Sequence, residues 1–264
     1  INFIQIGKGE TLCQFAFNTI FTMCDDILID LSNRYENADF LNGDPSWFMH
    51  QVSGKANKEI MALIASSLSY GSRKQFIPKI QYILDSSQGD LYNWILSGRY
   101  NIDIPNDDVC YYRLHTRKCL NIFLRGIKDM LTEYNTIGEY VKENASNGLD
   151  AIKAITNWFS NYKENKLIPK DTVSACKRIC MFLRWMVRDN SPVDLGIWSD
   201  FIDKRTLIIP MDTHVVNEAI ALKLIDSPST SMSNAIKLTK RLSKTFPDDP
   251  LKGDFALFGY GVNK

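Results

Sequence analysis

The spacing of apolar residues most constrains the fold of this chain, because it follows the helical period from one end to the other. In "NKEIMALIASSLSY", for example, apolar residues recur at intervals of three and four at Ile60, Leu63, Ile64 and Leu68, which places them on one face of a helix. Pro, Asn, Asp and Gly separate such segments, as they do between helices. The pattern predicts an all-α protein.

The predicted helices follow from the same pattern. A pair is expected to meet near Tyr70 and Gly71, with apolar stripes at 60–68 and 76–84. The others are expected over residues 27–35, 91–96, 112–131, 136–141, 148–160, 173–188, 212–224 and 232–246, with a short helix within 254–260. Helix caps and Pro or Gly positions set these limits.

Length and composition indicate a single folded body. The chain has 264 residues, of which 45% are hydrophobic, enough to bury a sizeable core. Gly and Pro are scattered, so no linker divides the chain. We expect one helical domain over residues 23–264, built from two closely packed subdomains, with residues 1–22 as an N-terminal extension.

Charge and hydropathy limit the possible partners. The formal net charge is +1, so a polyanion would have to be bound by local basic patches and not by the field of the whole protein. No apolar run approaches the roughly twenty residues needed to cross a bilayer. These features predict a cytoplasmic protein that does not bind a membrane.

The six cysteines do not form the dense framework of a small secreted protein. A zinc site is one alternative, and its ligands would be Cys110, His115, Cys119, Cys176 and Cys180. The spacing is loose for zinc and the thiols lie on apolar helix faces, so buried thiols are favoured. We therefore predict no metal.

The predicted helix over 173–188 carries a row of cations. Asp171 is expected to cap it, and Lys177, Arg184 and Arg188 share one face because they are spaced by seven and four residues. Such a row suits a line of phosphates. The alternative is an ordinary solvated face, or arginines paired with acids elsewhere.

The segment "IIPMDTHVVNEAIALKLI" places a Pro, an Asp and a His at the start of an apolar helix. Pro210 ends the preceding run, and Asp212 is a typical N-cap. A capping carboxylate is rigid, and its second oxygen is free to face a cleft. Asp212 is therefore either a cap alone or a cap that is also catalytic, and His214 is either a motif neighbour or a first-turn residue that bonds nearby groups.

Together, "ACKRICMFLRWMV" and "IPMDTHVVNEAIALKL" resemble the helix–hairpin–helix DNA glycosylase superfamily. The resemblance implies a two-lobed helical fold, with Lys177 as a Schiff-base nucleophile and Asp212 as the catalytic carboxylate. It implies double-stranded DNA with a damaged base, such as an oxidised one, as the substrate. The activity would be base excision, with strand cleavage if the lysine reacts.

A closer resemblance covers roughly residue 25 to the end. The phrases "SACKRICMFLRWMVRDNSPVDLGIW", "IPMDTHV" and "DPLKGDFALFGYGV" are similar to a widespread bacterial family known mainly as a conserved domain of unknown function. This similarity places the chain in a family without indicating its reaction.

The chain departs from the glycosylase pattern in three places. The hairpin "LIPKDTVSACK" has no Gly, so backbone amides there are not expected to grip phosphate as closely. Lys177 and Asp212 stand 35 positions apart, which implies an inserted loop over residues 189–207 that lies over the site. No Cys follows Cys180, so no iron–sulfur cluster and no other cofactor is expected.

Further binding residues follow from the resemblance. Arg178 is a candidate for contacting DNA, and Arg184 and Arg188 for holding either phosphate or the inserted loop. Trp185 and Trp198 are candidates for stacking an extruded base, although a core position is the usual one for Trp. An aromatic and basic run over 111–118 is either a nucleic-acid contact or a mixed helix surface. Two other functions stay open, which are a non-catalytic nucleic-acid-binding protein and a helical protein that binds a small molecule or a protein without a DNA role.

Overall fold

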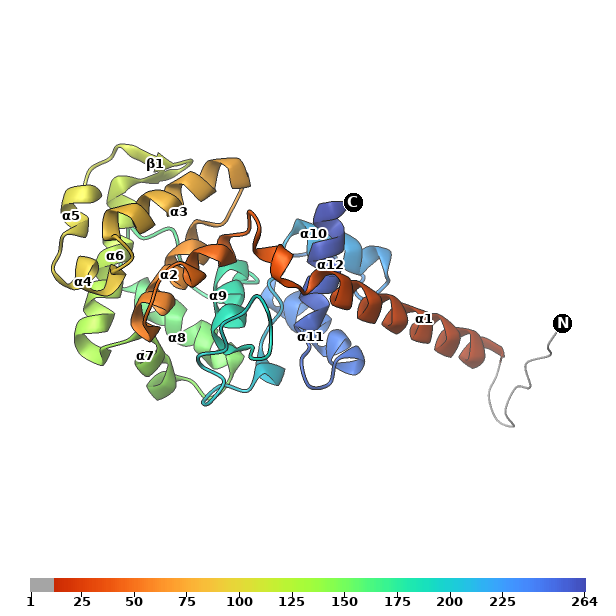
Figure 1. Ribbon diagram of the computed structural model, residues 1–264. Coiled ribbons are helices and arrows are strands. Elements are labelled where there is room, and N and C mark those ends of the chain that lie inside the picture. Colours follow the sequence, from red (N-terminus) through yellow and green to blue (C-terminus); the bar gives the residue numbers. More distant parts are fainter. Residues whose placement is uncertain (1–11) are drawn as a thin grey trace.

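The computed structural model describes residues 12–264, and side chains from residue 23 onward. The chain in this range is mostly helical (Figure 1), which confirms the predicted all-α class. Of the predicted N-terminal extension, residues 1–11 lie outside the described residues. The helix α1 (Leu12–Tyr35) runs through the predicted boundary at residue 22.

The first group of elements lies on one side of the molecule in Figure 1. After the short 3-10 helices η1 (Ala38–Leu41) and η2 (Pro45–His50), it comprises α2 (Lys55–Leu68), α3 (Arg73–Ser87), α4 (Leu91–Leu96), α5 (Tyr100–Asp103), α6 (Arg117–Tyr134), α7 (Ile137–Asn144), α8 (Gly148–Ser160) and α9 (Lys177–Val187). Between α5 and α6, β1 (Cys110–Tyr112) and β2 (His115–Thr116) form an antiparallel hairpin.

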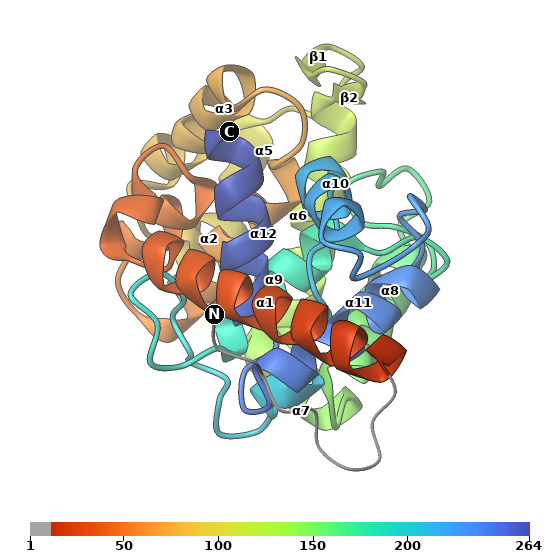
Figure 2. The same ribbon diagram turned by 90° about the vertical axis from the view of Figure 1, so that its right-hand side faces the viewer.

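The second group combines the N-terminal helix with the C-terminal ones. The chain leaves α9 through a loop with the 3-10 helix η3 (Lys204–Thr206) and then forms α10 (Thr213–Ala221), α11 (Met232–Thr245) and α12 (Lys252–Asn263). Figure 2 shows α1 crossing α12, and these two helices make extensive contact. Helix α9 lies between the groups, packed on α2 and α8.

Local sequence signals account for most element bounds. The predicted ranges 91–96 and 148–160 match α4 and α8, whose N-caps Asp90 and Asn147 accept backbone N–H bonds as polar caps do. The predicted break near Gly71 is also confirmed, since residues 69–72 separate α2 from α3 and Gly71 has a φ of 79°, which favours glycine.

Two predicted helices begin too early. Helix α6 begins at Arg117 and not at residue 112, because residues 110–116 pair as the hairpin. Helix α9 begins at Lys177 and not at 173, so Asp171 does not cap it; its Oδ1 accepts only from Val173 N, at 3.0 Å. Residues 173–175 are instead held extended by hydrogen bonds to residues 230–232.

The loop over residues 189–207 is placed differently from the prediction. It packs against the C-terminal end of α9, where Leu195 N and Trp198 N each donate to a carbonyl of the last turn, those of Trp185 and Met186, at 2.8 Å. Lys177 lies at the opposite end of this 11-residue helix, about 16 Å away at the usual rise per residue. The loop therefore does not lie over the predicted site.

No helix within residues 12–264 combines the length and the apolar character that crossing a bilayer requires.

Candidate functional site

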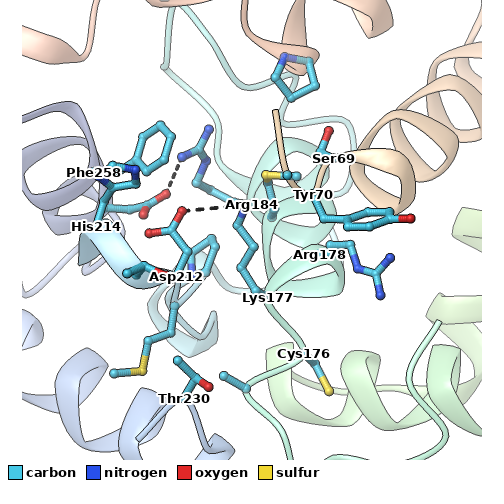
Figure 3. A pocket seen from close by; sticks show the side chains of 18 of the residues that line it. Ser69, Tyr70, Cys176, Lys177, Arg178, Arg184, Asp212, His214, Thr230 and Phe258 are labelled. Atoms are coloured by element: carbon cyan, nitrogen blue, oxygen red, sulfur yellow. Dashed lines mark hydrogen bonds and ion pairs between the residues drawn. The ribbon is translucent and has the colours of Figure 1, made fainter. Parts of the chain in front are cut away.

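A cavity of about 930 Å³ lies where the two groups of helices meet. It is lined by the first turns of α9 and α10, by α12, by the α2–α3 connection and by the hairpin residue His115. The predicted residues Lys177, Arg178, Asp212 and His214 all line it (Figure 3). The chain thus brings distant segments together at the position of the predicted catalytic pair.

Lys177 is the first residue of α9 and reaches the cavity with its side chain 29% exposed. The residue before it, Cys176, has left-handed backbone angles (φ 46°, ψ 39°) and caps the helix with no side-chain bond. This turn joins the extended segment 173–175 to the helix. A buried cysteine here thus adopts a conformation that glycine favours.

Asp212 is the N-cap of α10, as predicted. Its Oδ1 accepts from Val215 N at 3.0 Å, and its Oδ2 lies 3.8 Å from Lys177 Nζ. The preceding segment 208–211 is buried and is fixed by a 3.0 Å hydrogen bond from Ile209 N to Thr239 Oγ1. One oxygen of Asp212 is thus held by the helix while the other faces the amine.

His214 lies in the first turn of α10, on its exposed side, and lines the same cavity. Its Nδ1 is 3.0 Å from the carbonyl oxygen of Gly261, and its ring packs edge-on against Phe258. These contacts join α10 to α12. His214 is therefore held in place beside Asp212 in the cavity wall.

Asp254 also lines the cavity and was not among the predicted site residues. It lies in the first turn of α12, is 3% exposed, and forms an ion pair with Arg184 Nη1. The pKa of Asp254 is raised to about 6, mainly by burial and also by the charge of Asp212, while Arg184 and Lys177 act in the opposite direction. A second carboxyl group with perturbed protonation thus adjoins the predicted pair, and only its three-dimensional neighbours reveal it.

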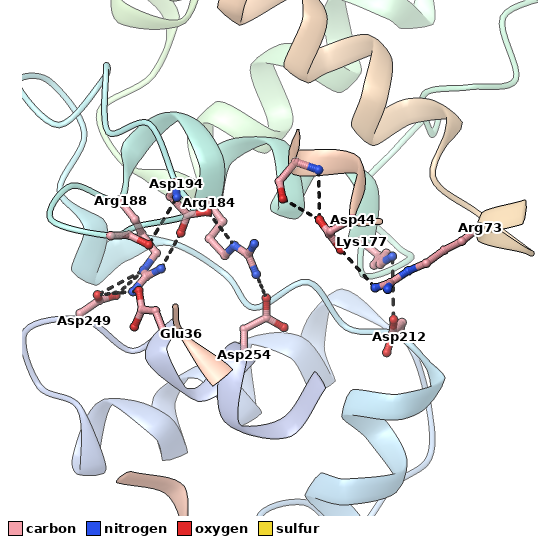
Figure 4. Close-up of polar contacts among 12 residues, drawn as sticks. Glu36, Asp44, Arg73, Lys177, Arg184, Arg188, Asp194, Asp212, Asp249 and Asp254 are labelled. Atoms are coloured by element: carbon pink, nitrogen blue, oxygen red, sulfur yellow. Dashed lines mark hydrogen bonds and ion pairs between the residues drawn. The ribbon is translucent and has the colours of Figure 1, made fainter. Parts of the chain in front are cut away.

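The predicted phosphate contacts of Arg184 and Arg188 are not compatible with the structure. Their side chains are 4% and 1% exposed, and both are ion-paired with Asp194 (Figure 4). Arg188 also pairs with Glu36 and Asp249. The alternatives that these arginines pair with acids elsewhere and hold the inserted loop are the ones observed. Asp194 belongs to the 189–207 loop, so neither guanidinium is free to bind phosphate.

The two tryptophans predicted to stack on an extruded base are also buried in the core. Trp185 and Trp198 are both 0% exposed and neither lines the cavity. Trp198 donates from Nε1 to Glu59 at 2.8 Å and packs edge-on against Phe182. The core role that was the alternative for these residues is the one observed.

The cysteines do not gather around a metal. Within the described residues, no group of three or more Cys, His, Asp and Glu side chains is arranged to hold an ion. Cys119 Sγ lies 3.5 Å from His115 Nδ1, whereas Cys110 is exposed on the hairpin. Burial raises the pKa of the thiols of Cys119, Cys176 and Cys180, which makes them less reactive.

A family model described as "Protein of unknown function (DUF2400)" matches residues 44–263. The chain belongs to this family. The DUF2400 match covers most of the described chain and includes Lys177, Asp212, Asp254 and the rest of the cavity wall from residue 44 onward. Neither a curated protein nor a solved structure matches the chain.

Proposed function

We propose that this protein is a DNA base-excision glycosylase with lyase activity, built on the helix–hairpin–helix glycosylase plan. The observation that carries the proposal is the 3.8 Å separation of Lys177 Nζ and Asp212 Oδ2 within one cavity. The resemblance assigns the nucleophile to a lysine at a helix start and the carboxylate to an Asp at a helix mouth. Here they are the first residue of α9 and the N-cap of α10.

The chemistry begins at the amine. Asp212 accepts the proton that Lys177 must lose before its lone pair can attack. Nζ then bonds to C1′ of the damaged nucleotide while the bond from C1′ to the base breaks. The base leaves with the bonding electrons and takes up the proton that Asp212 accepted, which returns Asp212 to its ionised form.

Strand cleavage follows from the same intermediate. Opening of the sugar ring leaves a Schiff base between Lys177 Nζ and C1′. Loss of a proton from C2′ then expels the 3′ phosphate by β-elimination. Water finally hydrolyses the Schiff base and returns the free amine.

The cavity supports a nucleotide as the bound group. Its volume of about 930 Å³ lies within the range of about 300–1,000 Å³ for small-ligand sites. Tyr70, Met181 and Phe258 contribute apolar surface to its wall, and enzymes that act on bases hold the extruded base against such side chains.

Borohydride trapping tests the proposal. Duplexes carrying an abasic site, 8-oxoguanine or other damaged bases are incubated with the protein and sodium borohydride, which reduces a Schiff base to a stable adduct. The parent protein is expected to form an adduct on at least one duplex, and Lys177→Gln to form none. Lys170→Gln is the control, since Lys170 is exposed in the connection that precedes α9.

Two outcomes contradict the proposal. An adduct that persists in Lys177→Gln removes this lysine from the mechanism. No adduct on a broad panel favours the alternatives, and a DNA-binding assay then separates a non-catalytic nucleic-acid-binding protein from a helical protein without a DNA role.

A further inference from the structure

Three arginines of α9 differ in how their charge is neutralised. Arg184 and Arg188 are buried among the carboxylates described above. Among the side chains of residues 23–264, no carboxylate forms an ion pair with Arg178, and its Nη1 donates instead to the carbonyl oxygen of Ser67 at 2.8 Å. A partly buried cation without a counter-ion is costly, so this position calls for an explanation.

The surroundings of Arg178 are aromatic and cationic. Its guanidinium lies over the ring of Tyr70, 5.4 Å from the ring centre, and Arg113 lies 5.6 Å from the same ring centre. Burial lowers the pKa of Arg178, and the groups that oppose this shift are Tyr70 and two cysteines, not acids. The fold therefore places the guanidinium in a region that lacks negative charge.

His115 lies in the same positive electrostatic potential. It is buried in the cavity wall beside Tyr70, and its pKa is lowered to about 4 by burial, with the positive charges of Arg178 and Lys166 acting in the same direction. An acid near this ring would oppose that shift. The neutral imidazole leaves Arg178 as the charged group of this part of the wall.

The cavity thus has two unlike ends. Figure 3 shows Asp212 and His214 on one side of Lys177, and Tyr70 and Arg178 on the other. At one end Asp212 and Asp254 are paired with Lys177 and Arg184, whereas at the other end Arg178 has no ion-pair partner among the described side chains. A ligand that reaches both ends would place an anionic group at Arg178 and its reacting atom near Lys177.

We propose that Arg178 is the centre of a phosphate subsite at the end of the cavity opposite Asp212. A guanidinium binds phosphate through paired N–H bonds, and the aromatic ring and the Ser67 carbonyl orient its plane. The start of α9 adds to the site, because the first N–H groups of a helix lack partners within the helix and favour anions, and the Cys176 side chain does not cap them. The subsite is independent of the Schiff base proposed for Lys177.

Inorganic phosphate is the first probe. Thermal unfolding is followed at rising phosphate concentration, with chloride at matched ionic strength as the reference, because a ligand that binds the folded state raises its stability. The parent protein is expected to be stabilised by phosphate beyond the chloride reference. Arg178→Gln is expected to weaken phosphate binding about tenfold or more, the usual effect of losing charge-assisted hydrogen bonds.

Two further variants keep this test decisive. Arg125→Gln is the matched control, since Arg125 also lies over a tyrosine ring, that of Tyr162, but is exposed and outside the cavity; it is expected to bind phosphate as the parent does. Arg178→Lys keeps a cation without the planar fork, and is expected to bind phosphate more weakly than the parent and more tightly than Arg178→Gln.

Two more probes identify the source of the phosphate. The titration is repeated with thymidine 5′-monophosphate and with a single-stranded oligothymidylate. If Arg178→Gln also weakens binding of the oligonucleotide, the bound phosphate belongs to a nucleic-acid backbone. If the substitution weakens binding of inorganic phosphate and thymidine 5′-monophosphate only, the bound phosphate belongs to a free small molecule. Both results support the subsite.

The proposal is overturned if phosphate stabilises the parent no more than chloride does, or if Arg178→Gln retains the parent's affinity for phosphate. Because phosphate binding needs no covalent step, this result is separate from that of borohydride trapping. A protein that forms no adduct on any duplex still gives a definite answer here.

Discussion

At the scale of single residues, Asp212 has two roles, one for each of its carboxylate oxygens. Oδ1 caps α10 and Oδ2 faces Lys177. The cap contact fixes the side chain, so the oxygen that faces the amine is positioned without further ordering. Capping therefore serves the proposed chemistry and is not an alternative to it.

Substitutions at Asp212 separate the two roles. Asp212→Asn keeps an N-cap acceptor and is expected to leave stability near that of the parent, whereas Asp212→Ala should cost about 1 kcal/mol. Both should slow adduct formation, because neither side chain accepts a proton from Lys177. Urea unfolding and single-turnover trapping measure the two effects, and equal stability losses in both variants would contradict the division.

At the scale of elements, the start of α9 sets the position of Lys177, the proposed nucleophile. The helix begins after a left-handed residue, Cys176, at the end of a segment held extended by residues 230–232. In a helix that began at residue 173, the side chain of Lys177 would lean over the preceding turn, because helical side chains point toward the helix N-terminus. The turn at Cys176 therefore positions Lys177.

The turn can be tested by a matched pair of substitutions. Cys176→Val and Cys180→Val make the same chemical change at two buried positions, the N-cap of α9 and its interior, but only residue 176 has a positive φ. Left-handed angles cost a side-chain-bearing residue about 1–2 kcal/mol and suit β-branched residues least. Cys176→Val is expected to be the less stable in urea, and similar stabilities would show that the turn is not strained by a branched side chain.

Local pattern predicted the elements that local forces determine. Helices such as α4 and α8 follow from their caps and apolar stripes, and the cap at Asp212 follows from its position after Pro210. The predicted start of α9 at residue 173 was wrong because residues 173–175 bond to residues 230–232, more than fifty positions away, and this contact competes with helix formation. Periodicity along one segment carries no information about such a contact.

The same limit explains the errors at the site. The spacing of Arg184 and Arg188 correctly places them on one face of α9, but only the fold shows that α12 and the 189–207 loop cover this face. Asp254 was passed over for the same reason, since its importance comes from its burial beside Arg184. Lys177 and Asp212 could be predicted as a pair because their sequence motifs, and not their distance along the chain, single them out.

At the scale of the whole molecule, the buried ion pairs join the two groups of helices. Arg188 binds Glu36 after α1, Asp194 in the loop and Asp249 before α12, and Arg184 binds Asp194 and Asp254 (Figure 4). All of these pairs involve either Arg184 of α9 or Arg188 at its C-cap, and the same helix carries Lys177. The network therefore fixes the groups of helices between which the cavity lies.

Asp194 is the shared partner of both arginines, and its side chain is fully buried. Asp194→Ala removes a shared counter-ion from two buried guanidiniums and is expected to lower the free energy of unfolding by about 3–5 kcal/mol. Asp30→Ala removes the exposed pair of Asp30 with Arg34 and should cost under about 1 kcal/mol. Urea unfolding compares the two, and similar losses would mean that the network adds little to the stability of the fold.

The central claim is that Lys177, facing Asp212, is the reacting amine. The most direct test is to trap the parent protein on its most reactive duplex with borohydride, digest the adduct and locate the modified lysine by mass spectrometry. The account predicts that the modification lies on Lys177 alone. A modification on another lysine, or one spread over several exposed lysines, would contradict it.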